Sequence, residues 1–195
     1  MARIMGSLTI FVGPMFAGKS TQLLREREKY QFSKKLFKLL TISHIFDGGR
    51  IGREQKIIRT HSDLFCEATH MVSKLLPILE DTEYIESDVI FIDEGQFFDD
   101  IYEFCEEVMK TKNVYVAFLS GTFERKPFGK SYLLYSIATS IVHVKAICSY
   151  CDTPSEAPYT IKIGGNIDKI VEVGAGDKYV PVCLKHYLEF ENLKI

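Results

Sequence analysis

The clearest chemical signal in the chain is an octapeptide with two glycines, a lysine and a serine, Gly13-Pro14-Met15-Phe16-Ala17-Gly18-Lys19-Ser20. It follows the apolar run Leu8–Val12, and its spacing is that of a phosphate-binding loop (P-loop) between a strand and a helix. Glycines let backbone amides approach phosphate oxygens, the lysine reaches the outer phosphates, and the serine hydroxyl can ligate Mg2+. We assign all eight residues to binding of a nucleotide's phosphates with Mg2+. The alternative is a Gly-Pro turn before an ordinary amphipathic helix.

Two adjacent acids, Asp93 and Glu94, follow the apolar run Val89–Ile92. An acid at the end of a buried strand can hold the Mg2+ shell, and a second acid can take a proton from an attacking hydroxyl or water. In isolation such an acid could equally cap a helix. Beside a phosphate-binding loop we predict that Asp93 serves the metal and Glu94 is the catalytic base, with Gln96 among the cofactor-binding residues.

Two short pairs of residues could hold a metal, namely Cys148 with Cys151 and Cys183 with His186. Three thiolates and one imidazole form a set suited to tetrahedral structural zinc. The stretch between the pairs is longer than the usual zinc-ribbon spacer, which leaves room for a functional loop. The alternative is two unrelated pairs of buried thiols, since cysteine often serves as a small hydrophobe.

An aromatic and cationic loop is expected at residues 119–129, after a predicted strand. Phe123 and Phe128 could dock into the core, or they could shape an apolar slot at the active edge of the sheet. In the second case the cations Arg125 and Lys126 would lie near phosphate or at a subunit contact.

The elements that must position these residues follow from the apolar patterns. Strands are predicted at Leu8–Val12, Leu36–Ser43, Val89–Ile92, Val114–Leu119 and Ile141–Ile147, and helices at Thr21–Phe32, Val72–Glu80, Asp99–Lys110 and Ser131–Thr139. This alternation predicts an α/β fold with a doubly wound parallel sheet, which binds ligands at the carboxyl ends of its strands. A change of character near Cys148 predicts a P-loop domain over residues 1–147 and a small second domain over 148–195.

Bulk composition restricts the classes of partner. The chain has 195 residues, 46% of them hydrophobic, which suits one main domain and a small appendage. A net charge of −2 and a pI near 6.2 give no reason to expect a nucleic-acid polymer or an anionic membrane as partner. We expect a cytoplasmic protein, because we find neither an export signal nor an apolar run of about 18 residues. An odd set of five cysteines favours metal ligation or buried thiols over disulfides.

Four motifs, in order, resemble the type II thymidine kinase family of cytosolic and viral enzymes. They are GPMFAGKS, DEGQFF, GTFERKPFG and the paired Cys/His knuckles that flank a GDKY-like segment, and they span residues 8–186. The resemblance implies transfer of the ATP γ-phosphate to the 5′-hydroxyl of thymidine, giving dTMP and ADP, with Glu94 as the general base. It also implies that Asp47 and Arg50 belong to a mobile loop at the cofactor. The implied nucleoside site comprises Met15, Phe97, Leu119, Phe123, Thr160 and Tyr179, to which we add Phe128 from the aromatic loop.

The resemblance implies further that the C-terminal domain is zinc-ribbon-like and that a lasso loop within Thr153–Val182 folds over the nucleoside. It implies a homotetramer and feedback binding of thymidine triphosphate (dTTP). Three departures from the family pattern stand out. His186 replaces a fourth cysteine, Ser120 replaces an acid, and the order Gly174-Ala175-Gly176 is altered within a turn that could be structural or could approach a flat base.

Two other functions fit parts of the pattern. A nucleic-acid-stimulated P-loop ATPase with a zinc ribbon would explain the acids and the cysteines, but it calls for a second motor sheet and a basic excess. A nucleotide-sensing assembly module would bind ATP without turnover, and the intact set of Lys19, Ser20, Asp93 and Glu94 argues against it.

Overall fold

The centre of the molecule is a parallel β-sheet. The computed structural model describes residues 5–46, 57–59, 64–165, 169–170 and 178–192. The sheet consists of β1 (Ser7–Gly13), β2 (Leu39–His44), β5 (His70–Val72), β6 (Val89–Ile92), β7 (Asn113–Leu119) and β8 (Ser140–His143). Its six strands run in the order β5-β2-β6-β7-β1-β8, and every neighbouring pair is parallel. The predicted parallel α/β sheet is thus confirmed.

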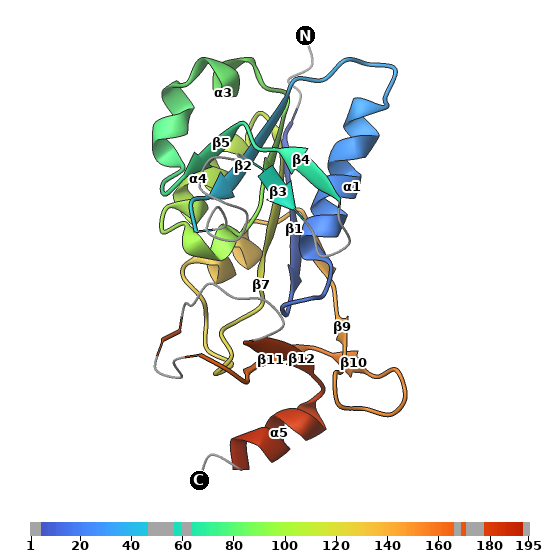
Figure 1. Cartoon of the computed structure of the whole chain (residues 1–195). Helices are drawn as coiled ribbons and strands as arrows, with labels where there is room; N and C mark the ends of the chain where they lie inside the picture. The colour runs from blue at the N-terminus through green and yellow to red at the C-terminus, as the bar shows by residue number, and fades with distance from the viewer. Residues whose placement is uncertain (1–4, 47–56, 60–63, 166–168, 171–177, 193–195) are drawn as a thin grey trace.

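Helices pack on both faces of this sheet, because both faces are apolar. Successive strand side chains point to opposite faces, so Ile10 and Phe11 of β1 enter different clusters. The Ile10 face packs against α4 (Ile101–Val108) and the 3-10 helices η1 (Leu76–Glu80) and η3 (Ser131–Ser136). The Phe11 face packs against Leu23 of α1 (Lys19–Gln31). Figure 1 shows α1 on one side of the sheet and α4 on the other.

Several predicted elements differ from those observed. In the predicted helix Val72–Glu80, β5 ends at Val72 and η1 begins at Leu76. Pro77 lies in the first turn of η1, where its missing N–H is not needed, so it does not interrupt the helix. The predicted helix Ser131–Thr139 is instead the 3-10 helix η3.

The predicted strand Ile141–Ile147 is split in two. β8 ends at His143, and the next residue, Val144, donates its N–H to the carbonyl of Val12. The chain then leaves the sheet and forms β9 (Ala146–Ile147), which pairs antiparallel with β10 (Glu156–Ala157). Sequence analysis did not predict the hairpin of β3 (Ile57–Arg59) and β4 (Phe65–Glu67), nor the helices α3 (Thr82–Glu86) and α5 (Leu184–Asn192).

The C-terminal elements form a separate apolar cluster. β11 (Tyr159–Lys162) pairs antiparallel with β12 (Tyr179–Val182), and α5 follows β12 directly. Buried side chains from these elements and from β9 and β10 pack together, among them Ile161, Val182 and Tyr187. Figure 1 shows this group beyond the carboxyl-terminal ends of β1 and β7. The exact division into 1–147 and 148–195 stays a prediction.

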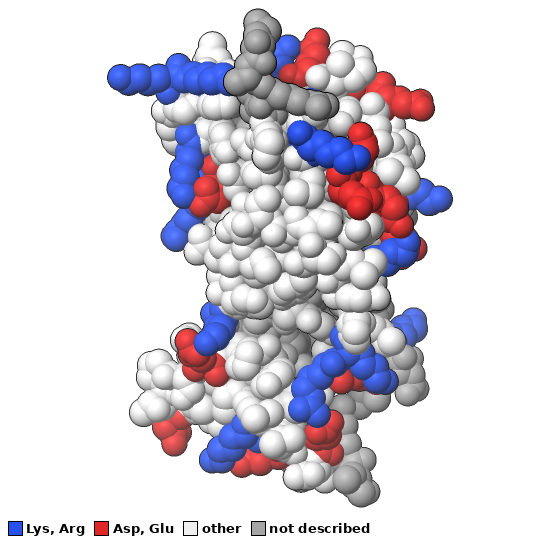
Figure 2. All heavy atoms as spheres, turned by 180° about the vertical axis from the view of Figure 1, so that it is seen from behind, with Lys and Arg blue, Asp and Glu red and all other residues white. Residues whose placement is uncertain are grey.

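Charge is unevenly distributed over the surface. Figure 2 shows a broad band without Lys, Arg, Asp or Glu across the back of the molecule, between two charged ends. The segment 131–144, which forms η3 and the edge strand β8, contains none of these four residue types, and Tyr132, Tyr135 and Ile141 are exposed on it. Among the described residues, every helix is too short or too polar to cross a bilayer.

Candidate active site and metal centre

The octapeptide Gly13–Ser20 connects the end of β1 to the start of α1. Gly18 is the N-cap of α1 and has φ of 82°, in the left-handed region that glycine tolerates best. This conformation lets the chain enter the helix with Lys19 and Ser20 in its first turn. The first backbone amides of a helix have no partner within it and carry the positive end of the helix dipole, so they favour an anion. The Lys19 ammonium donates a hydrogen bond of 2.7 Å to the carbonyl of Pro14.

Asp93 lies beside this loop, directly after β6. The residue is 3% exposed, and its Oδ1 accepts a hydrogen bond of 3.0 Å from the Ser20 hydroxyl. The same oxygen accepts a 3.0 Å hydrogen bond from the backbone N–H of Glu94. A carboxylate and a hydroxyl are the hard oxygen donors that suit Mg2+. The predicted neighbourhood of the lysine-bearing loop and the two acids is therefore present in the structure.

Glu94 is held by Gln96. The backbone of Glu94 has φ of 54°, which is uncommon for a residue with a side chain. Its Oε2 accepts a hydrogen bond from the Gln96 side-chain amide, and Oε1 of Gln96 accepts a 3.0 Å hydrogen bond from the N–H of Leu119. The buried Gln96 side chain thus connects the acid to the end of β7. The assignment of Gln96 to the cofactor stays a prediction, and the hydrogen bonds observed for Gln96 orient Glu94.

Gly129 packs against the backbone of this segment. Its φ is +58°, and an added Cβ would lie 2.3 Å from the carbonyl oxygen of Gln96. A larger residue here would displace the turn that carries Glu94. Sequence analysis missed this contact, although the terminal glycine of GTFERKPFG was the available signal.

Aromatic rings surround the segment that follows the acids. Phe97 and Phe128 meet edge to face with their centroids 5.4 Å apart. The buried ring of His44, at the end of β2, lies 5.4 Å from Phe97 and 4.8 Å from Phe98. Its Nδ1 accepts a hydrogen bond from the N–H of Phe46. The structure thus places His44 in the core, against Phe97 and Phe98.

The pKa of His44 reflects its position near the acids. Burial lowers this pKa below its ordinary value, while the carboxylates of Glu94, Asp99 and Asp100 act in the opposite direction. The hydrogen bond from Phe46 requires an unprotonated Nδ1. Burial and hydrogen bonding therefore both favour the neutral imidazole.

Three other residues predicted for the nucleoside lie near the Gly13–Ser20 loop or near one another. The hydroxyl of Thr160, on β11, accepts a 3.0 Å hydrogen bond from the N–H of Met15 in this loop. Phe123 and Tyr179 are both buried, and both of their rings face the ammonium of Lys162. The C-terminal elements thus contact the loop after β1 directly.

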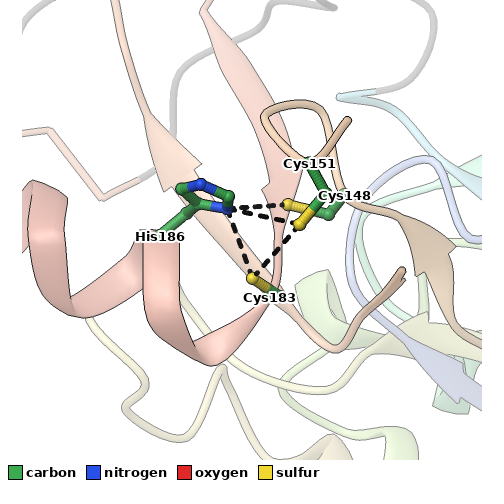
Figure 3. A group of neighbouring side chains, drawn as sticks. All are labelled: Cys148, Cys151, Cys183 and His186. Carbon is green, nitrogen blue, oxygen red and sulfur yellow. Dashed lines mark hydrogen bonds between the residues drawn. The ribbon is translucent and has the colours of Figure 1, made fainter. Parts of the chain in front are cut away.

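The predicted metal ligands converge in space. Cys148, Cys151, Cys183 and His186 place their ligand atoms within 4.8 Å of one another. Figure 3 shows the three sulfur atoms facing Nδ1 of His186, and their distances to Nδ1 are 3.3, 3.6 and 3.3 Å in the order of the cysteines. Cys183 immediately precedes α5, which carries His186 in its first turn. This Cys3His set has the chemistry and convergence that a structural zinc ion requires.

The thiol of Cys148 is prepared for ligation. Burial raises its pKa, but hydrogen bonds from the backbone amides of Cys183 and Tyr150, together with those from the side chains of His186 and Cys151, outweigh burial and lower the pKa to about 6. A lowered pKa favours the thiolate, which is the form that binds metals. On the far side of the His186 ring, Nε2 lies 3.8 Å from a carboxylate oxygen of Glu189.

Not every predicted site residue can be placed. Asp47 and Arg50 lie outside the described residues, as do Gly174, Ala175 and Gly176. Sequence analysis also missed Lys162, which looks like an exposed lysine at the end of a short strand and is instead 1% exposed.

Comparison with known proteins identifies the relatives of this chain. The model of the thymidine kinase family matches residues 6–187. The protein named "Thymidine kinase, cytosolic" from Homo sapiens is 40% identical over 190 residues, which cover 94% of this chain and 74% of the human protein. The thymidine kinase of Myxoma virus (strain Lausanne) is 38% identical, covering 96% of this chain and 99% of its own length. That of Vaccinia virus (strain Western Reserve) is 38% identical, with coverages of 94% and 98%.

Proposed function

Since this chain belongs to the thymidine kinase family, we propose that it transfers the γ-phosphoryl group of ATP to the 5′-hydroxyl of thymidine, giving dTMP and ADP. The observation that carries the proposal is the hydrogen bond between Ser20 and Asp93. It brings the phosphate-binding octapeptide and the two acids to one edge of the sheet, where parallel α/β folds bind their ligands.

The octapeptide Gly13–Ser20 is proposed to hold the phosphates of ATP. Backbone amides at the start of α1 face the phosphate oxygens, and the Lys19 ammonium exchanges the carbonyl of Pro14 for the outer phosphates. Ser20 and Asp93 hold Mg2+, with their oxygen atoms already adjacent. When bound, Mg2+ neutralises charge on the transferred group. Asp47 and Arg50 are proposed at the same cofactor from the family pattern alone.

Glu94 is proposed as the general base. Phosphoryl transfer needs the acceptor hydroxyl held in line and relieved of its proton, and a carboxylate can do both. The hydrogen bond from the Gln96 amide to Oε2 orients the Glu94 carboxylate, which we propose accepts the proton of the 5′-hydroxyl. The backbone N–H of Glu94 donates a hydrogen bond to the Asp93 carboxylate, which holds the proposed base at a fixed position relative to the proposed metal ligand.

Thymidine is proposed to bind among the residues predicted for it, Met15, Phe97, Leu119, Phe123, Phe128, Thr160 and Tyr179. The Thr160–Met15 hydrogen bond and the Phe97–Phe128 ring contact support this grouping, since they join these residues across different elements. We further propose that the chain between β11 and β12 acts as the lasso over the nucleoside. dTTP is proposed to bind at the same place as a feedback ligand.

Zinc is proposed to be structural. Its ligands come from the knuckle at 148–151 and from the start of α5, so one ion would join both ends of the C-terminal group. A four-ligand protein site leaves no open position for substrate, as is usual for structural zinc.

A nucleoside panel tests the activity. Purified protein is incubated with labelled ATP, Mg2+ and each common deoxyribonucleoside, and the 5′-monophosphates are separated. The proposal expects dTMP as the main product. Hydrolysis of ATP that depends on added nucleic acid, without dTMP, would instead support the ATPase, and binding without turnover would support the sensing module.

A homotetramer in the cytoplasm is proposed from the cytosolic and viral relatives. The uncharged segment 131–144, with exposed Tyr132, Tyr135 and Ile141 along an edge strand, supports self-association because it offers apolar area and unpaired backbone groups. Light scattering coupled to size exclusion measures the mass. A monomer at micromolar concentration would contradict this assembly.

A further inference from the structure

Lys162 is a buried cation in the C-terminal group. It is the last residue of β11, it stands opposite Tyr179 in the β11–β12 ladder, and it is 1% exposed. Lysine is almost never fully buried unless it is paired, because removing an ammonium from water is costly. Its contacts therefore indicate why the fold keeps it there.

The Lys162 ammonium contacts groups from separate parts of the chain. Nζ donates a 2.8 Å hydrogen bond to the carbonyl of Lys169. It also lies 5.5 Å from the ring centroid of Phe123 and 5.6 Å from that of Tyr179. Both distances are within the range of a cation–π interaction, which gains strength when the cation is desolvated. One ammonium thus joins the loop after β7 to the β11–β12 hairpin.

Phe123 is held from a second side as well. Its carbonyl accepts a 3.0 Å buried hydrogen bond from the hydroxyl of Tyr187, on α5. Its backbone is therefore tied to α5, while its ring faces Lys162.

We propose that Lys162 is a positioning residue for the nucleoside, which fixes the rings of Phe123 and Tyr179 in the arrangement that receives the pyrimidine base. This inference rests on the proposed function, because it assigns those two rings to the base. Lys162 acts through the two rings and not on the reacting atoms. Its loss should therefore weaken thymidine binding and leave ATP binding and the chemical step largely intact.

The experiment compares Lys162→Met, which keeps an unbranched apolar stem and removes the charge, with Lys162→Arg, which keeps the charge. We expect Lys162→Met to raise KM for thymidine by about tenfold, with KM for ATP and kcat within about threefold of wild type. Lys162→Arg should return KM for thymidine to within about threefold of wild type. Calorimetry with thymidine alone should show the same order of affinities.

Lys145→Met is the matched control, since Lys145 is an exposed lysine paired with Glu156. Thermal unfolding and zinc content show whether each variant folds. If Lys162→Met does not fold, the same kinetic constants are measured for Lys162→Gln. Glutamine can still donate a hydrogen bond to the Lys169 carbonyl but carries no charge, so the same increase in KM for thymidine is expected.

An unchanged KM for thymidine in a folded, uncharged variant would overturn the inference, as would equal increases in KM for thymidine and ATP. Failure of the proposed function looks different, since the wild-type protein would then produce no dTMP. If the wild-type protein phosphorylates thymidine and the KM for thymidine is unchanged in Lys162→Met, only the positioning role of Lys162 is rejected, and the proposed function stands.

Discussion

The hydroxyl of Ser20 and the carboxylate of Asp93 are joined by a hydrogen bond of 3.0 Å. Ser20 lies in the first turn of α1, and Asp93 follows β6, so the bond links two elements that are 73 positions apart in sequence. The Asp93 oxygen that accepts it also accepts the backbone amide of Glu94. One oxygen atom of the buried Asp93 therefore connects the Gly13–Ser20 loop to the proposed base.

Removing either partner of this pair should raise the Mg2+ requirement. We expect Ser20→Ala and Asp93→Asn each to increase the Mg2+ concentration for half-maximal rate by about tenfold or more, since each removes an oxygen donor to the cation or its support. Because both residues act on the same ion, the double variant should be less impaired than the two single effects combined predict. Steady-state rates over a Mg2+ titration at saturating ATP and thymidine give these values.

Ser33→Ala is the control for this series, because the Ser33 hydroxyl donates to the backbone carbonyls of Tyr30 and Lys35 just after the end of α1. Its Mg2+ requirement should match that of wild type. Fully independent effects of Ser20→Ala and Asp93→Asn would contradict a shared metal shell.

Glu94→Gln should lower turnover severely while leaving ATP affinity nearly unchanged. An amide cannot accept the proton of the 5′-hydroxyl, and general-base catalysis typically contributes about 10²–10⁴-fold. The shape of the side chain and the hydrogen bond from the Gln96 amide to its oxygen can both be kept. We expect kcat to fall by about a hundredfold or more and the ATP dissociation constant to stay within about threefold.

Glu107→Gln is the matched control, since Glu107 is an exposed acid on α4 paired with Lys110. It should have wild-type kinetics. Equal losses in ATP affinity and turnover for Glu94→Gln would show that Glu94 serves the cofactor and not the acceptor hydroxyl.

Parts of the fold were predictable because local pattern and tertiary environment agree. The run Val89–Ile92 was predicted with the bounds observed for β6, since all four residues are apolar and fully buried between two helical layers. The run Ile141–Ile147 is also largely apolar, but it contains His143 and Lys145, and its residues belong to two different sheets. Its division depends on the hydrogen bond from Val144 to Val12 and on the pairing of β9 with β10, and neither can be deduced from apolar periodicity.

Some features of the site were likewise predictable from sequence, and others were not. The proximity of Ser20 and Asp93 was predictable from sequence, because each follows a buried strand and the carboxyl ends of parallel strands lie at one edge of a sheet. The Cys3His set was predictable from spacing. The support provided by Gln96, Gly129 and Lys162 was not, since each depends on a partner from a distant segment: the N–H of Leu119, the carbonyl of Gln96 and the ring of Phe123.

Removing the metal should unfold the C-terminal group first. Cys151→Ser deletes one of the four ligands, and loss of a structural metal is among the few single changes that cost on the order of 4 kcal/mol or more. We expect this variant to lose its zinc, to unfold at a lower temperature and to phosphorylate thymidine poorly. Atomic absorption, calorimetric unfolding and the kinase assay measure the three effects.

Cys66→Ser tests whether any cysteine substitution would do the same. Cys66 is partly buried on β4 and does not belong to the cluster of four ligands. It should keep wild-type zinc content. A Cys151→Ser protein with full zinc content would reject the proposed ligand set.

His44 should make stability depend on pH below neutrality. Burial lowers its pKa in the folded protein below the value of 6.5 that it has when unfolded, against the opposing carboxylates of Glu94, Asp99 and Asp100. As pH falls through 6.5, the unfolded chain takes up a proton that the folded protein does not, so the free energy of unfolding decreases. The decrease continues until pH reaches the folded pKa.

Replacing His44 with phenylalanine removes this titration but keeps an aromatic ring between Phe97 and Phe98. Between pH 7.5 and 5.5, urea unfolding should therefore lose less free energy in His44→Phe than in wild type, by at most about 1.4 kcal/mol per pH unit, the limit for one proton. A His44→Phe protein whose stability falls as steeply as that of wild type would mean that His44 takes up its proton equally in the folded and unfolded states, so that the apolar surroundings built by Phe97 and Phe98 do not hold the imidazole neutral.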